Sequence, residues 1–262
     1  MYSSALGKLK ETPNRTMTQS AAPQTRTELN PIERSISIRL ALVFALRMFG
    51  LFVVLPVLAP YALGLPLGFG FTDSPTPEQT GLAVGLAMGA YGLTQAFLYI
   101  PYGLASDKWG RKPLITLGLI IFAIGSFWAA TADSIYGLAM ARALQGMGAI
   151  SSVVVAMVAD TTRTEVRTRA MAMIGMSIAF TFAVSLIVGP ILFDWVGMHG
   201  IFILIGVLAL LALLLIWSIP LAPLDANHTP ISSKKAMQQV LTDKRQWLLN
   251  FGVFVLHAVQ MA

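Results

Sequence analysis

The segment GLASDKWGRKP occupies residues 103–113 and lies between two apolar runs that are each long enough to cross a bilayer. Six of its positions suit a short, charged connection: Gly103, Asp107, Lys108, Gly110, Arg111 and Lys112. Gly110 permits a sharp reversal of the chain, and the cations flank the next apolar run. The alternative is a tight loop whose cations only fix orientation, but orientation requires neither the glycines nor the aspartate. The segment therefore predicts a functional connection between two membrane spans.

Composition indicates a membrane-embedded protein. Of the 262 residues, 56% are hydrophobic and only 11% are charged, whereas about 25% of a typical soluble domain is charged. Such a surface is stable against lipid. The net charge of +6 does not indicate a nucleic-acid partner, because the cations are spread over loops instead of one soluble face. The absence of cysteine excludes disulfides and thiolate chemistry, and we expect no catalytic residue, cofactor or metal ion.

Apolar runs predict six membrane spans. They cover residues 38–61, 80–102, 113–132, 135–158, 170–193 and 200–219. At a rise of 1.5 Å per residue, each is long enough for a hydrocarbon layer of about 30 Å. A seventh run begins at Trp247 and meets the last residue of the sequence before it is long enough to span. We therefore interpret the chain as a fragment of a longer protein.

The predicted domain organisation follows from these runs. Residues 1–36 predict a disordered cytoplasmic tail, and residues 37–220 a six-span bundle. Residues 221–246 predict a cytoplasmic linker with an amphipathic helix, and residues 247–262 the start of a truncated seventh span. All but two of the 18 lysines and arginines fall in the tail, the linker or the loops on one side of the bundle. The positive-inside rule places that side and the amino terminus in the cytoplasm.

The loop and the span pattern resemble the major facilitator superfamily over residues 34–262. GLASDKWGRKP is similar to the signature loop of that family, and ARALQGMGA at residues 141–149 resembles its Arg-x-x-Gln-Gly pattern. Residues 185–190 resemble the Gly-Pro signature of the drug/proton antiporter branch. The resemblance implies an all-α, polytopic membrane protein that forms the six-helix amino-terminal half of a 12-helix fold, built as a 3+3 inverted repeat. It also implies the bacterial inner membrane and a carboxy-terminal half as partner.

The resemblance implies secondary transport of a small molecule by alternating access, with protons driving efflux. It further implies that Asp107 lies against the start of a helix from the second half, where the helix dipole favours negative charge. Arg111 would pair with an acid at the end of span four, which here is Asp160. These contacts would close the cytoplasmic side in the outward-open state. The alternatives are a membrane sensor or scaffold without transport, or an inactive transporter fragment.

Polar side chains within the spans are candidates for a substrate or proton pathway: Arg47, Tyr91, Gln95, Arg142, Gln145 and His257. An arginine at mid-bilayer costs about 2.5–3.5 kcal/mol on insertion scales, so Arg47 and Arg142 are expected to line a central cavity. The alternative for Arg142 is a structural role, in which it donates hydrogen bonds to backbone carbonyls between helices. None of the 12 acids lies in the middle of a complete span, which leaves His257 as a titratable candidate, with polar packing as its alternative.

Small residues recur every four positions in two spans. Gly81, Gly85 and Gly89 form a row in span two and predict close contact with another helix. A similar row in span five ends at Gly189, and the following Pro190 lacks a backbone donor. We therefore expect a bend near the outer end of span five.

Overall fold

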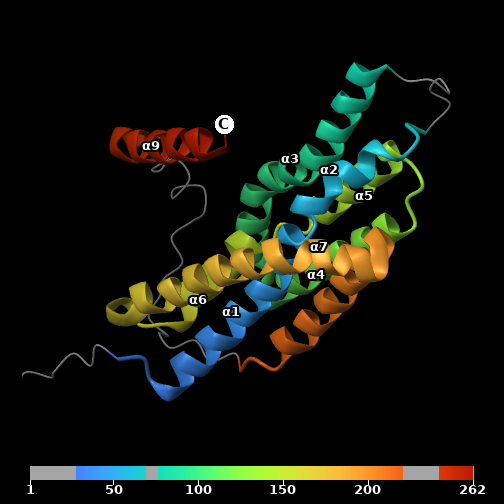
Figure 1. Cartoon of the computed structure of the whole chain (residues 1–262). Coiled ribbons are helices and arrows are strands. Elements are labelled where there is room, and N and C mark those ends of the chain that lie inside the picture. Colours follow the sequence, from blue (N-terminus) through green and yellow to red (C-terminus); the bar gives the residue numbers. More distant parts are fainter. Residues whose placement is uncertain (1–27, 69–75, 221–241, 262) are drawn as a thin grey trace, which may run out of the picture.

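The computed structural model describes residues 28–68, 76–220 and 242–261, and all regular secondary structure in these ranges is helical. The helices are α1 (Pro31–Phe52), α2 (Leu55–Leu63), α3 (Pro77–Trp109), α4 (Arg111–Ala130), α5 (Ile135–Met147), α6 (Ser151–Thr161), α7 (Thr164–Trp217) and α9 (Lys244–Met261). Figure 1 shows α1 to α7 as an elongated bundle, with α9 apart from it. The predicted all-α fold is confirmed. The predicted tail up to residue 27 and most of the predicted linker lie outside the described residues.

Two of the helices begin at capping boxes. Before α1, the Asn30 N–H donates to the Glu33 carboxylate at 2.8 Å. Before α3, the Thr76 N–H donates to the Gln79 side chain at 3.0 Å, and the Gln79 N–H donates to the Thr76 hydroxyl at 3.3 Å. These bonds satisfy backbone donors that a helix start leaves unpaired. The first helix consequently begins at Pro31, inside the segment that the sequence predicts as tail.

Spans one and four each consist of two helices. Span one is α1 followed by α2, and Pro56 in the first turn of α2 has no N–H to continue the hydrogen bonding from α1. Span four is α5 followed by α6, interrupted at Gly148, whose φ of −74° and ψ of 49° are not helical. A Cβ on Gly148 would lie 2.4 Å from the backbone oxygen of Gly118, so glycine allows α4 to approach this break closely.

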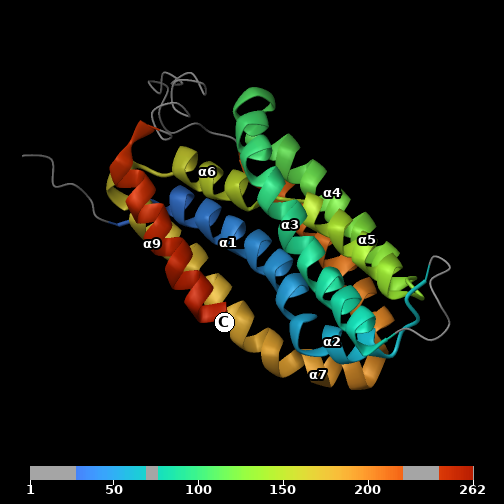
Figure 2. The same cartoon turned by 90° about the horizontal axis from the view of Figure 1, so that it is seen from above.

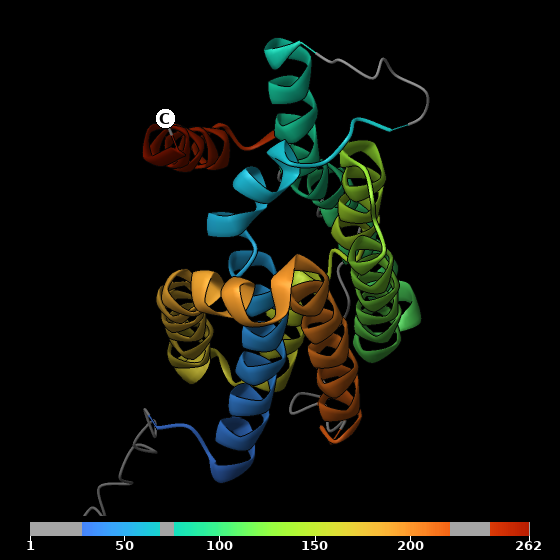
Figure 3. The same cartoon turned by 45° about the vertical axis from the view of Figure 1, so that its right-hand side comes forward.

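Spans five and six lie in α7, which has 54 residues. An unbroken helix of that length would measure about 80 Å, more than twice the thickness of the hydrocarbon layer. The helix is broken at Gly197, where φ is 65° and ψ is −178°, a conformation that is accessible essentially to glycine alone. Figure 3 shows the two parts of α7 running in different directions from this turn. The five helical segments that are apolar and long enough to span therefore provide six crossings.

The helices interleave around two apolar cores. α1 packs against α7, α3 against α5, and α4 against both α5 and α7 (Figure 2). One core contains Val57 and Phe202, and the other contains Leu40 and Val154. The second core lies at the end where α1 begins and α3 ends. We call this the basic end, after its cations: Arg34, Arg39, Lys108, Arg111, Lys112, Arg163, Arg167 and Arg169.

The outer surface of the bundle is apolar. Phe97 on α3 and Ile187 on α7 are 79% and 69% exposed, and large aliphatic side chains surround them along both helices. Soluble monomers rarely expose contiguous apolar areas of this kind. The bundle is therefore a membrane-embedded protein, as its composition predicts.

Candidate functional site

Two arginines occupy the interior of the bundle. Arg47 of α1 is fully buried and Arg142 of α5 is 1% exposed, and they are the largest fully buried side chains among the described residues. Gln145, one turn after Arg142, is also fully buried. Buried cations are costly unless they are hydrogen-bonded or neutralised, so their surroundings decide what they do.

Arg47 holds together the two helices of span four. Its Nη2 donates to the Gly148 carbonyl at 3.0 Å, and its Nη1 donates to the Ser151 hydroxyl at 3.0 Å. Gly148 follows the end of α5 and Ser151 begins α6. The end of a helix presents unpaired carbonyls and a partial negative charge, which a guanidinium stabilises. Arg47 therefore has a structural role at the break, whatever else it does.

Arg142 belongs to a chain of side chains that leads from α5 to α4. Its Nη1 donates to Gln145 Oε1 at 3.0 Å, and Gln145 Nε2 donates to the Ser126 hydroxyl at 2.8 Å. The Ser126 hydroxyl donates to the carbonyl of Phe122 at 2.7 Å. Arg142 Cζ also lies 4.8 Å from the ring centroid of Tyr91 on α3, within the range of a cation–π contact.

Arg47, Arg142, Gln145 and Tyr91 form an interior cluster, and several of its hydrogen-bond donors are unused. The Nε atoms of Arg47 and Arg142 and the Tyr91 hydroxyl are buried without a hydrogen-bond partner in the described part of the chain. Both guanidiniums face the same tyrosine, because Arg47 Cζ lies 6.0 Å from its ring centroid. Neither arginine forms an ion pair with a described acid. A buried polar cluster with spare donors is typical of a site that a polar ligand or another protein segment completes.

The placement of these side chains differs from the prediction in one respect. Arg47, Arg142 and Gln145 are buried and are not exposed on a cavity wall of the described chain. Their partners lie inside the bundle: Arg47 bonds to the break in span four, and Arg142 bonds to Gln145, which bonds to Ser126. On α3, Tyr91 is buried as well, whereas Gln95 is partly exposed. The side chain of His257 lies outside what the structure describes.

The signature loop forms a chain of ion pairs at the basic end. Arg111 Nη1 lies 2.6 Å from Asp107 Oδ1, and Arg111 Nε lies 2.8 Å from Asp160 Oδ2. Arg111 also donates to the Ser106 hydroxyl. The links join the end of α3, the start of α4 and the end of α6. Gly110, with a φ of 91°, makes the reversal between α3 and α4 that the sequence predicts.

The other cations of the loop are placed in contrasting environments. Lys108 is exposed. Lys112 is buried, and its ammonium donates to the carbonyl of Ile219 and lies 6.0 Å from the ring centroid of Trp217. The sequence did not predict this link between the start of α4 and the end of α7, because nothing local to either segment encodes it. A Cβ on Gly103 would meet no atom within 4 Å.

The predicted packing glycines fall into two groups. Gly189 approaches the break in span one, since a Cβ there would lie 2.6 Å from the carbonyl oxygen of Val53. A Cβ on Gly81, Gly85 or Gly89 would meet no atom within 4 Å, so no described helix packs on this row. Pro190 lies inside α7, and the backbone leaves helical φ and ψ at Gly197, later in the chain, so the bend at Pro190 stays a prediction. Proline removes one hydrogen bond, whereas a positive φ changes the chain direction.

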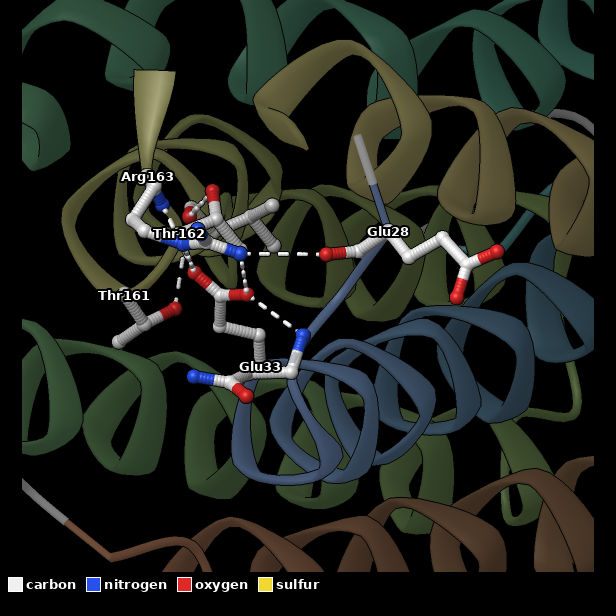
Figure 4. A network of polar contacts seen from close by, with 7 residues as sticks. Glu28, Glu33, Thr161, Thr162 and Arg163 are labelled. Carbon is white, nitrogen blue, oxygen red and sulfur yellow. Dashed lines mark hydrogen bonds and ion pairs between the residues drawn. The ribbon is translucent and has the colours of Figure 1, made fainter. Parts of the chain in front are cut away.

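A second polar network at the basic end was not predicted (Figure 4). Glu33 of α1 is 1% exposed and pairs at 2.9 Å with Arg163, the residue just before α7. Hydrogen bonds from Arg163 to Glu33 raise the pKa of the Arg163 guanidinium, against an opposing effect of desolvation. The only local signal was the capping-box position of Glu33.

Comparisons with known proteins agree on one family. The sequence model described as Major Facilitator Superfamily matches residues 40–262. The inner membrane transport protein YajR of Escherichia coli (strain K12) is 43% identical over 90% of this chain and 50% of YajR. An uncharacterized transporter of Buchnera aphidicola subsp. Schizaphis graminum (strain Sg) is 37% identical over 88% of this chain and 56% of that protein. The chain thus spans about half the length of these relatives.

Solved structures show the same fold at low sequence identity. A bacterial homologue of the human lysosomal transporter Spinster, in an inward-facing and unoccupied conformation, has a TM-score of 0.64 at 17% identity. It aligns over 86% of this chain and 52% of its own. The human organic anion transporter MFSD10 has a TM-score of 0.58 at 21% identity, over 72% of this chain and 48% of its own.

Proposed function

Because the chain belongs to the Major Facilitator Superfamily, we propose that it is the amino-terminal half of a secondary transporter that moves a small molecule across the bacterial inner membrane by alternating access. We extend this proposal to proton-coupled efflux. The multidrug resistance protein MdtH of Proteus mirabilis (strain HI4320), which is 30% identical over 67% of this chain, supports drugs as the substrate class. The proton part of the extension rests on the likeness of residues 185–190 to the drug/proton antiporter signature. The cytoplasmic location of the basic end rests on the positive-inside rule.

The ion-pair chain of Asp107, Arg111 and Asp160 carries the proposal. The three side chains are 43%, 20% and 47% exposed, so water and salt reach them and each link contributes little to stability. A link of this kind can form and break during a transport cycle. We propose that it holds the basic end closed, with Asp107 facing a helix start from the second half.

The exposed glycine row of α3 supports the proposal of a second half as partner. Gly81, Gly85 and Gly89 leave open space along one side of the helix, and no described residue fills it. Small residues at this spacing allow two membrane helices to approach closely. We propose that a helix from the carboxy-terminal half lies on this row and that the two halves rock against each other there.

Of the two interior arginines, we propose that Arg142 contacts the substrate, once a rearrangement of the helices uncovers it. Arg142 uses one of its five N–H donors among the described residues, so it has capacity for a polar group of the substrate. The middle of the described spans holds no acid, so we place the proton carrier at His257 or in the second half. Movement of one half toward the other would bring this proton carrier near Arg142.

Replacing Asp107 with asparagine should favour the state that is open at the basic end. A single cysteine at Leu104, which is 39% exposed on α3, reports this opening: the 262 residues contain no native cysteine, and any cysteine of the second half is first replaced by serine. In the full-length protein, we expect a thiol reagent added from the cytoplasmic side to react about tenfold faster, which corresponds to about 1.4 kcal/mol. Asp133→Asn, at the opposite end, is the control. Equal rates in the two variants would argue against the gate.

Transport itself is tested with the full-length protein in vesicles. We expect accumulation of at least one compound from a panel of drugs and metabolites when a proton gradient is imposed, and loss of accumulation when an uncoupler collapses the gradient. Accumulation that survives the uncoupler would leave transport standing but contradict proton coupling. No flux for any compound, from protein that remains folded, would favour a sensor.

A further inference from the structure

We infer that Glu33 is a positioning residue for the gate: through Arg163 it fixes the end of α6, so that Asp160 faces Arg111. The inference rests on the proposed gate, but its geometric part stands on the contacts of the network in Figure 4. Glu33 begins the first span and lies far from the signature loop in sequence. The last residues of α6 connect Glu33 to the signature loop.

Glu33 is held from two directions. Its carboxylate accepts from the N–H of Asn30 at 2.8 Å, which ties it to the start of α1. It also accepts three bonds from Arg163: from the backbone N–H at 3.2 Å, from Nε at 2.9 Å and from Nη2 at 3.1 Å. A buried carboxylate with this many donors has one preferred geometry. Glu33 therefore fixes both the backbone and the side chain of Arg163.

Arg163 passes this constraint to the end of α6. The hydroxyls of Thr161 and Thr162 donate back to the carbonyls of Met157 and Val158, each at 2.7 Å, so the last turn of α6 is closed onto itself. Asp160 belongs to the same turn. Because the residues on both sides of Asp160 are fixed, its carboxylate stays where Arg111 reaches it at 2.8 Å.

The two ends of this connection differ in burial, and the difference suits a gate. The Glu33 carboxylate is 1% exposed, whereas Asp160 is 47% exposed. Arg163 is 35% exposed, but breaking the pair would leave the buried Glu33 carboxylate without its cation, so the Glu33 link stays formed. Exposed ion pairs are weak and screened by salt, so the Asp160 link opens readily. The buried pair keeps α6 in place while the exposed pair breaks, and the exposed pair can then form again.

A distance measurement tests the positioning in the 262-residue chain. Spin labels on cysteines at Trp109 and Thr168, both exposed, report the separation between the end of α3 and the start of α7. We expect a single narrow distance in the parent. Glu33→Gln should at least double the width of the distribution, and Arg163→Lys, which keeps the charge but loses the fork of donors, should broaden it less.

Glu28→Gln is the matched control. The backbone carbonyl of Glu28 accepts from Arg163 at 3.1 Å. Figure 4 shows that the Glu28 carboxylate points away from this contact. The substitution removes the same charge at the same end of the bundle and keeps that contact, so the distance distribution should equal that of the parent. Helix content by circular dichroism confirms that each variant is folded. A Glu33→Gln distribution as narrow as that of Glu28→Gln overturns the inference, whatever the gate does.

Combination with Asp160→Asn tests whether Glu33 acts through Asp160. In the full-length protein with the cysteine at Leu104, Glu33→Gln and Asp160→Asn should each raise the rate of modification several-fold. The double variant should be no faster than Asp160→Asn alone, because the positioning has lost its target. If the rate increase of the double variant equals the product of the two single increases, Glu33 acts independently of Asp160, and the inference is overturned. If Asp160→Asn alone has no effect while the distances broaden as expected, the gate fails and the positioning remains.

Discussion

Replacing Gly146 with alanine is expected to lower the free energy of unfolding of the chain by about 3 kcal/mol, at the upper end of the usual cost of overpacking. The new Cβ would lie 2.0 Å from the Thr94 hydroxyl and 2.2 Å from the backbone oxygen of Tyr91. A side chain can rotate away, but the backbone of α3 cannot. The helices α3 and α5 would have to separate, and the bond from Thr94 to the carbonyl of Ala143, now 2.8 Å, would lengthen.

The same substitution at Gly89 provides the control. A Cβ there meets no atom within 4 Å, and alanine is favoured over glycine inside a helix by about 0.5–1 kcal/mol. Gly89→Ala should therefore leave the chain as stable as the parent or slightly more stable, measured by denaturant unfolding in detergent. An equal loss at both positions would contradict the packing of α3 on α5. In the full-length protein, where we propose a helix on this row, Gly89→Ala should instead be destabilising.

The positions of the spans could be predicted because hydropathy depends on composition along the chain and not on contacts. The capping box at Asn30 and Glu33 was also present in the sequence, but the apolar criterion placed the start of span one later than Pro31. The break in span four could not be located from sequence. It depends on Gly148 meeting the backbone of Gly118, which is a contact between distant segments.

Only part of the candidate site could be predicted, because the rest depends on contacts between distant segments. Family resemblance pointed to Asp160 as the acid for Arg111, and the structure places the two side chains 2.8 Å apart. Their role in gating stays a prediction. The burial of Arg47 depends on where span four breaks, and the Glu33–Arg163 pair joins residues 130 positions apart. Neither the bonds of Arg47 to the break nor the Glu33–Arg163 pair leaves a periodic or local signal in the sequence, so sequence reasoning had no means of finding them.

Arg142→Gln and Arg47→Gln are expected to have opposite consequences, which separates a functional arginine from a structural one. Arg47 donates two hydrogen bonds across the break in span four, to Gly148 and Ser151. Its removal should lower the free energy of unfolding by about 2 kcal/mol: two hydrogen bonds from a charged group contribute about 3–6 kcal/mol together, and removal of a buried charge offsets part of the loss. Arg142 has one such bond, to Gln145, which keeps its own link to Ser126.

Arg142→Gln should leave stability unchanged or slightly higher, because it removes a buried charge that no described acid neutralises. Transport of a compound identified in the vesicle panel should fall about 100-fold, the effect of losing roughly 2.7 kcal/mol of contact with a polar ligand group. Denaturant unfolding and flux per mole of protein measure the two effects. Arg34→Gln, at an exposed site on the same helix as Arg47, should change neither. If Arg142→Gln lost stability as Arg47→Gln does while flux persisted, Arg142 would be a structural residue, and the substrate contact would have to lie elsewhere.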